Sequence, residues 1–110
     1  NENDTVFSFE GPLICEMACF CFDVLIRYLR NLNPPDRSHL PQCSTPLFVS
    51  WRSTNKQLRG CIGTFKPDNF HSDLTYYAVA SAVYDTRFPP IQYSEISNLV
   101  CSVSVLVCFE

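Results

Sequence analysis

The stretch of residues 58–65 constrains the fold of this chain most, because it reads as a β-strand and yet holds two of the three glycines in the sequence. Glycine weakens a strand interior and often marks a place where a ligand or another piece of backbone comes close. Side chains alternate along a strand, so Arg59, Cys61 and Gly63 face one way and Gly60 faces the other. A thiol, a guanidinium and the space beside Gly63 form a candidate site. The structural alternative is a strand crossed closely by a helix, with Cys61 as a small core residue.

This stretch, Leu58-Arg59-Gly60-Cys61-Ile62-Gly63-Thr64-Phe65, resembles the signature of the AMMECR domain family, which is named for Alport syndrome with mental retardation, midface hypoplasia and elliptocytosis. Four other segments match in the family's order: Cys21-Phe22-Asp23-Val24-Leu25, Pro46-Leu47-Phe48-Val49, Asp85-Thr86-Arg87-Phe88-Pro89-Pro90 and Cys101-Ser102-Val103-Ser104-Val105-Leu106. The resemblance covers the N-terminal part of a domain that is longer in other members. It implies an intracellular protein, often nuclear in animals, whose biochemical role in the family is unsettled.

The composition describes one small globular domain. The chain has 110 residues, of which 46% are apolar and 17% charged, and its net charge is −3. No basic run appears, which argues against nucleic acid as a partner. No apolar run reaches the roughly 18 residues that a membrane span needs. We therefore expect neither nucleic acid nor a membrane, and an unknown protein or small-molecule ligand remains as the expected partner.

Seven cysteines are many for a chain of this length, and an odd number cannot all pair within it. Their spacings match no C-x2-C metal pattern, and at least five lie inside apolar helix or strand patterns. We interpret them as reduced thiols, which predicts a cytoplasmic or nuclear protein without a metal or another cofactor.

Apolar periodicity predicts an α+β domain, in which α-helices pack on an antiparallel β-sheet. Segments whose side chains alternate with a period of two residues predict strands. The last of these strands is long and apolar on both faces, which suits the middle of a sheet. The turn at residues 54–57 is short, so the strands beside it should pair as a hairpin. The predicted helices span residues 12–32 and 72–85, and the predicted strands span 46–53, 58–65 and 100–110.

The predicted domain organisation is a mobile N-terminal arm, residues 1–11, followed by an AMMECR-like domain, residues 12–110, that is incomplete at its C-terminus. Because the last predicted strand ends at the chain terminus, an edge or an apolar face would be left uncovered. We therefore expect self-association of the truncated domain, or marginal stability.

Three functional interpretations stay open. The first is a binding or regulatory module, with a site formed by Arg59, Gly60, Cys61, Gly63, Asp85 and Arg87. The second is a thiol-dependent enzyme, with Cys61 as nucleophile and His71 as proton acceptor. The third is a purely structural motif that permits close packing. Because the segment with Asp85 and Arg87 matches the family as clearly as residues 58–65 do, we expect the two to meet in space, with Asp85 as the partner of Arg59.

Overall fold

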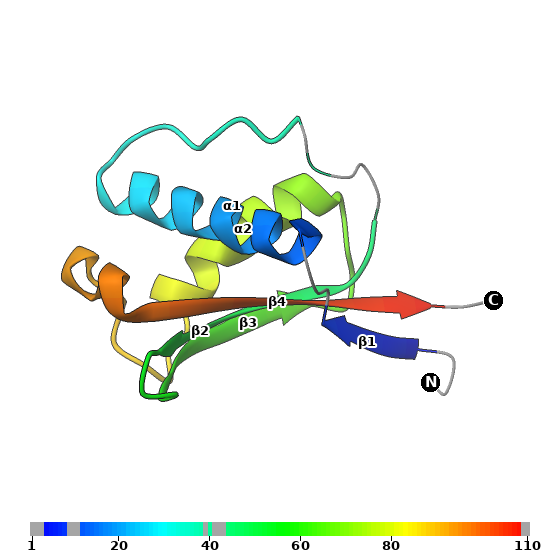
Figure 1. Ribbon diagram of the computed structural model, residues 1–110. Helices are drawn as coiled ribbons and strands as arrows, with labels where there is room; N and C mark the ends of the chain where they lie inside the picture. Colours follow the sequence, from blue (N-terminus) through cyan, green and yellow to red (C-terminus); the bar gives the residue numbers. More distant parts are fainter. Residues whose placement is uncertain (1–3, 9–11, 39, 41–43, 109–110) are drawn as a thin grey trace.

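The structure is a computed structural model that describes residues 4–8, 12–38, 40 and 44–108, with side chains described from residue 16 to residue 105 within those ranges. Along the chain lie β1 (Asp4–Ser8), α1 (Pro12–Leu29), β2 (Leu47–Ser53), β3 (Leu58–Thr64), α2 (Phe70–Val83), the 3-10 helix η1 (Tyr93–Asn98) and β4 (Leu99–Cys108). The strands form one antiparallel sheet in the order β1-β4-β2-β3, and α1 and α2 lie on the same side of it (Figure 1). The predicted α+β class, the hairpin of β2 and β3 and the inner position of β4 are confirmed.

The helix predicted over residues 12–32 ends earlier, at Leu29. Asn31 adopts a φ of 59°, in the left-handed region that asparagine tolerates. The amide of Leu32 then donates to the carbonyl of Arg27 at 2.8 Å, and the amide of Asn31 donates to the carbonyl of Tyr28 at 3.1 Å. These two bonds form a Schellman motif, which satisfies the last carbonyls of the helix before the prolines that follow.

Strand β1 was not anticipated. The polar, aperiodic sequence of residues 1–11 predicts a mobile arm, whereas residues 4–8 pair in register with β4, from Asp4 opposite Cys108 to Ser8 opposite Ser104. The other residues of that segment lie outside the described ranges. The extra strand pairs with one edge of β4, so β1 and β3 are the outer strands of the sheet that the described residues form.

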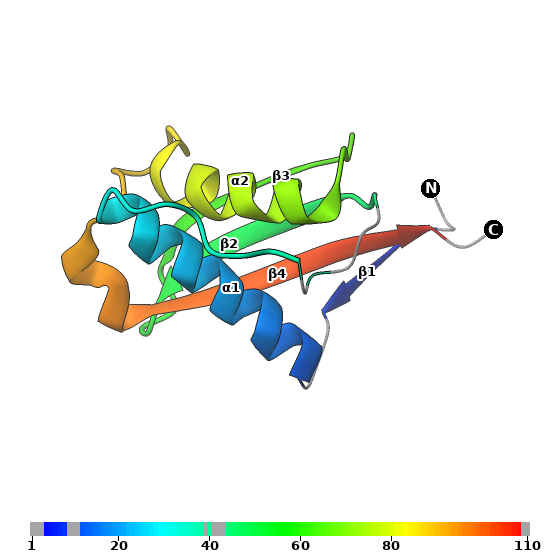
Figure 2. The ribbon, with the colours of Figure 1, turned by 90° about the horizontal axis from the view of Figure 1, so that it is seen from above.

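The core lies between the sheet and the two helices. Helix α1 runs over β4, while α2 lies over β2 and β3 (Figure 2). Trp51 of β2 is fully buried in this layer and donates its indole N–H to the Ala78 carbonyl at 3.2 Å and to Ser81 Oγ at 3.0 Å. The Phe22 and Trp51 rings lie nearly perpendicular to each other, with a centroid distance of 5.0 Å. One indole therefore ties both helices to the sheet.

Small residues let α2 lie very close to β3. Ala78, Ser81 and Ala82 are buried against the sheet, as the narrow stripe of small residues in this helix predicted. A Cβ atom added to Gly60 would overlap the carbonyl oxygen of Ser81. The first glycine of the signature is thus required by a close approach of helix backbone to strand backbone.

Candidate functional site

The face of the sheet that points away from the helices is the candidate site, and we call it the open face. Buried residues of β2 and β4 alternate with partly or fully exposed ones, because only one side of the sheet meets α1 and α2. The residues assigned to the open face by this alternation are Phe48, Ser50 and Arg52 of β2, Arg59, Cys61 and Gly63 of β3, and Val100, Ser102 and Ser104 of β4.

A row of three small polar residues crosses the middle of this face. Ser50 of β2 is the register partner of Cys61 on one side and of Ser102 on the other. Neighbouring strands lie about 4.8 Å apart, so the row spans roughly 10 Å across the sheet. We call these residues the small-residue row. Their short side chains leave the sheet surface accessible, and they offer two hydroxyl groups and one thiol to a ligand.

The sequence placed an empty space at Gly63, and the structure corrects this. A Cβ atom at Gly63 would overlap the Leu47 carbonyl and both backbone and ring atoms of Phe48 on β2. The Phe48 ring in turn packs edge-on against Phe65 at a centroid distance of 5.0 Å. An aromatic side chain from the neighbouring strand therefore fills the space, so an apolar border flanks the small-residue row, and Phe65 is 71% exposed there.

Asp85 and Arg87 meet the backbone of Cys61 at the outer edge of β3, so the predicted meeting of the two segments is confirmed. The Cys61 amide donates to Asp85 Oδ2 at 3.0 Å, and Arg87 Nη2 donates to the Cys61 carbonyl at 3.2 Å. Arg87 also donates to Asp85 through Nε at 2.9 Å and Nη2 at 2.7 Å. We call this pair the edge clip, because it occupies the hydrogen-bonding groups that another strand would use at Cys61.

The electrostatics of the edge clip favour its ionised form. The Arg87 guanidinium, and then the amides of Cys61 and Arg87, hold the pKa of the Asp85 carboxyl well below its usual range, against the opposing effect of desolvation. The Asp85 carboxylate in turn raises the pKa of Arg87, because it accepts hydrogen bonds from the guanidinium and carries the opposite charge. The Asp85 side chain is 6% exposed and that of Arg87 is 60% exposed. The carboxylate is therefore the buried anchor, and the guanidinium faces solvent.

The partner of Arg59 is Glu95, not Asp85 as the sequence suggested. Arg59 Nε and Nη2 donate to the two carboxylate oxygens of Glu95 at 2.9 and 3.1 Å, and Nη1 and Nη2 also donate to the Pro89 carbonyl at 3.3 Å. This ion pair, and then the amide of Gln92, lower the pKa of Glu95, opposed by desolvation. The Arg59 side chain is only 16% exposed, so it is largely covered, as expected. The Gln92–Glu95 capping box of η1 is the sequence signal that could have drawn attention to Glu95.

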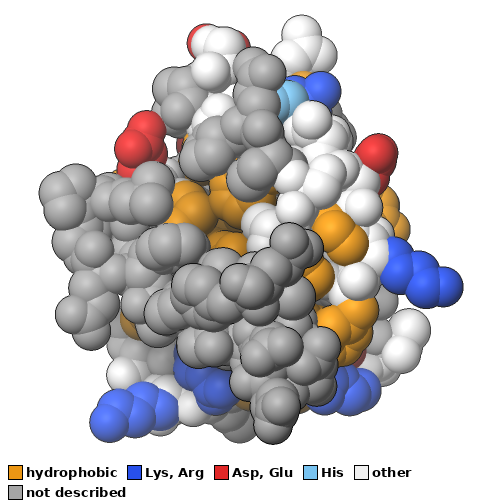
Figure 3. Space-filling model, turned by 90° about the vertical axis from the view of Figure 1, so that its right-hand side faces the viewer, with side chains coloured by type: hydrophobic (Ala, Val, Ile, Leu, Met, Phe, Trp, Pro, Cys, Tyr) orange, Lys and Arg blue, Asp and Glu red, His pale blue; other side chains and the backbone are white. Residues whose placement is uncertain are grey.

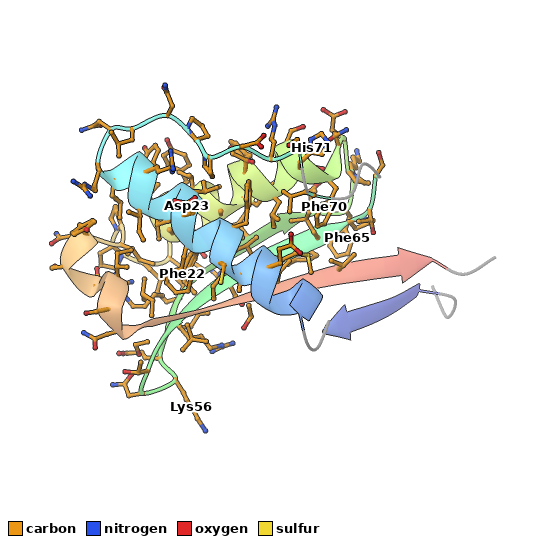
Figure 4. The ribbon with its side chains drawn as sticks, turned by 45° about the horizontal axis from the view of Figure 1, so that its top comes forward. Phe22, Asp23, Lys56, Phe65, Phe70 and His71 are labelled. Carbon is orange, nitrogen blue, oxygen red and sulfur yellow. The ribbon has the colours of Figure 1, made fainter. Side chains whose placement is uncertain are left out.

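His71 does not join Cys61. It lies in the first turn of α2, on the helix side of the sheet (Figure 4). Cys61 is assigned to the open face by the alternation along β3 and its register with Ser50. Among the described residues, neither the buried Nδ1 atom of His71 nor the buried Oδ1 atom of the nearby Asn69 has a hydrogen-bond partner. Asp85, the carboxylate beside Cys61, is a poor proton acceptor because its pKa is so low. Neither His71 nor Asp85 is therefore matched to the Cys61 thiol as its base.

Two further hollows lie elsewhere. One of about 240 Å³ is lined by Glu16, Cys19, Phe20, Asp23, Pro35 and Asp36, and one of about 170 Å³ by Val24, Tyr28, Leu32, Pro34, Thr75 and Val79.

Within the described ranges, no group of three or more His, Cys, Asp or Glu side chains is arranged to hold a metal ion. No helix among the described residues has both the length and the apolar character needed to cross a membrane.

Comparison with known proteins identifies the family. The AMMECR1 family model matches residues 18–110. An uncharacterised protein from Arabidopsis thaliana is 41% identical in an alignment of length 99, which covers 86% of this chain and 46% of the relative. An uncharacterised protein from Schizosaccharomyces pombe is 38% identical in an alignment of length 100, which covers 86% of this chain and 52% of the relative.

A solved structure agrees with the sequence relatives. The crystal structure of an uncharacterised protein from Pyrococcus horikoshii superimposes with a TM-score of 0.82 at 28% identity, covering 93% of this chain and 55% of that one. This chain thus spans about half the length of the relatives described. From the match over residues 18–110 and the shared fold, the chain belongs to the AMMECR1 family.

Proposed function

We propose that this domain is a binding or regulatory module and that its contact surface is the open face around the small-residue row. The observation that carries the proposal is the row itself: Cys61, Ser50 and Ser102 lie side by side on three adjacent strands, on the face that neither α1 nor α2 covers. Short polar side chains let a ligand approach the sheet closely. Its binding partner would be a small molecule or a protein segment.

The borders of the row support this role because other contacts hold them in place. The Arg59–Glu95 pair joins β3 to η1, and the edge clip joins β3 to the segment after α2. The other border contains the packed rings of Phe48 and Phe65. A surface that is already ordered loses little conformational entropy when it binds, which favours recognition.

A thiol enzyme receives less support, because the residue expected to accept the proton lies on the other side of the sheet. A cysteine nucleophile needs a base within hydrogen-bonding reach, or a comparable activating group. The described cysteines Cys19, Cys21, Cys61 and Cys101 are free thiols, which supports an intracellular location, in the cytoplasm or the nucleus.

A fragment screen monitored by ¹H–¹⁵N NMR tests the proposal. Small polar and aromatic fragments should shift the amide signals of Ser50, Cys61 and Ser102 together. A Ser102→Trp variant should lose these shifts, because a large ring in the row blocks access to it. Ser97→Trp, at another exposed serine, is the matched control and should keep them. Fragments that shift only the signals of α1 and α2 would contradict the proposal.

A further inference from the structure

The charges around the open face indicate what kind of partner it would bind. The whole chain is acidic, with a net charge of −3. On β2, β3, the turn between them and the segment after α2, the cations are Arg52, Lys56, Arg59 and Arg87, and the carboxylates with described side chains are Asp85 and Glu95. Several Lys and Arg side chains appear along the lower margin of the molecule, on the sheet side (Figure 3). This region is therefore locally basic on an acidic protein.

Two of these cations have no carboxylate partner among the described side chains. Arg52 and Lys56 are exposed and form no ion pair among the described residues. Arg52 lies on the open face beside the small-residue row, opposite Val100 of β4. Lys56 extends from the β2–β3 turn, away from the helices (Figure 4). Both positive charges are available to an anionic partner.

Arg87 provides a third positive group, already oriented. Asp85 holds its Nε and Nη2 atoms, whereas Nη1 makes no hydrogen bond to the described residues. The guanidinium also lies over the ring of Phe88, with 5.3 Å from Cζ to the ring centroid. A planar guanidinium held in this way can receive a carboxylate with little further loss of side-chain entropy.

We propose that the open face binds an acidic segment of a partner protein, an inference that rests on the proposed function. Its carboxylates would meet Arg52 and Arg87, and an apolar side chain would meet the exposed edge of Phe65. The small-residue row would lie beneath the segment and offer hydroxyl groups to its backbone. Nucleic acid fits less well, because the few cations are not arranged as the continuous basic stripe that a phosphate backbone requires.

The test uses a fluorescein-labelled peptide of alternating glutamate and leucine, with a peptide of lysine and leucine and a single-stranded DNA as comparison probes. Fluorescence anisotropy should show that the glutamate peptide binds and that its affinity falls as salt rises. Arg52→Glu should weaken its binding about fivefold, because the change replaces an attraction with a repulsion. Arg30→Glu, at an exposed arginine just after α1, is the matched control and should leave the affinity unchanged.

Each other outcome overturns the inference. Equal weakening by both variants would mean attraction to the chain in general, and tighter binding of the DNA would mean a nucleic-acid surface. A homodimer that buries Ser102, detected by sedimentation and NMR, would mean that a second copy occupies the face. If the glutamate peptide fails to bind while neutral fragments still shift the signals of Ser50 and Cys61, the acidic partner is wrong and the binding module stands.

Discussion

Replacing Arg59 with alanine should destabilise the domain by about 2 kcal/mol. The change removes two charge-assisted hydrogen bonds to Glu95 and two longer bonds to the Pro89 carbonyl. A hydrogen bond to a charged group contributes roughly 1.5–3 kcal/mol. The side chains of Arg59 and Glu95 are 16% and 33% exposed, so solvent screening holds the expected total near the lower part of that range.

The assay is urea denaturation followed by circular dichroism, which yields the free energy of unfolding. Arg59→Lys keeps the charge but loses the planar fork, so it should cost about 1 kcal/mol. Arg52→Ala is the matched control, since Arg52 is exposed on the same face and forms no ion pair with a described side chain, and it should change stability by less than about 0.5 kcal/mol. If Arg59→Ala and Arg52→Ala have the same small effect, the Arg59–Glu95 pair does not hold β3 to η1.

Three further experiments test the packing of α2 on β3, the edge clip and the position of Cys61. Gly60→Ala should lower the free energy of unfolding by about 2–3 kcal/mol, because α2 must move to clear the Ser81 carbonyl; unchanged stability in urea would contradict the close approach. The native pKa of Asp85 lies below its unfolded value, so its ionised form stabilises the domain at neutral pH, and this stabilisation is lost as the pH falls through about 4 and below. Asp85→Asn should therefore make the free energy of unfolding less dependent on pH in the acid range. An unchanged pH dependence would contradict the role of the edge clip. An alkylating reagent should modify Cys61 before the buried Cys21, as mass spectrometry would show. The pKa of Cys21 is raised by a hydrogen bond with Cys101 and by burial, which slows its reaction. The reverse order would contradict the assignment of Cys61 to the open face.

Local patterns were sufficient to predict most of the sheet and both helices. Alternation along residues 58–65 assigned Arg59 and Cys61 to one face, and the stripe of small residues in α2 indicated what Gly60 would approach. These inferences succeeded because the periodicity of a strand or helix and the size of its side chains can be read from a short stretch of sequence. The prediction that the segment of Asp85 and Arg87 meets Cys61 rested on the family resemblance and not on the periodicity of any helix or strand.

The features that the sequence did not predict depend on contacts between distant residues. Strand β1 is a short segment that gains its structure by pairing with β4 about a hundred residues later. Glu95 reaches Arg59 only because the chain after α2 turns back along the edge of β3. The space at Gly63 is filled by Phe48 from the neighbouring strand, which a single strand's pattern cannot reveal.

Disulfide tethering tests most directly whether the open face is a binding surface. The protein is equilibrated with a library of disulfide-bearing fragments under mild reductant, and peptide mapping by mass spectrometry assigns each adduct to a cysteine. Cys61 lies in the small-residue row, whereas exposed Cys19 on α1 lies on the helix side and serves as the internal comparison. The account predicts that Cys61 retains a selective subset of fragments and that Ser50→Trp removes them. Selective capture at Cys19 alone, or equal and unselective capture at both thiols, would contradict it.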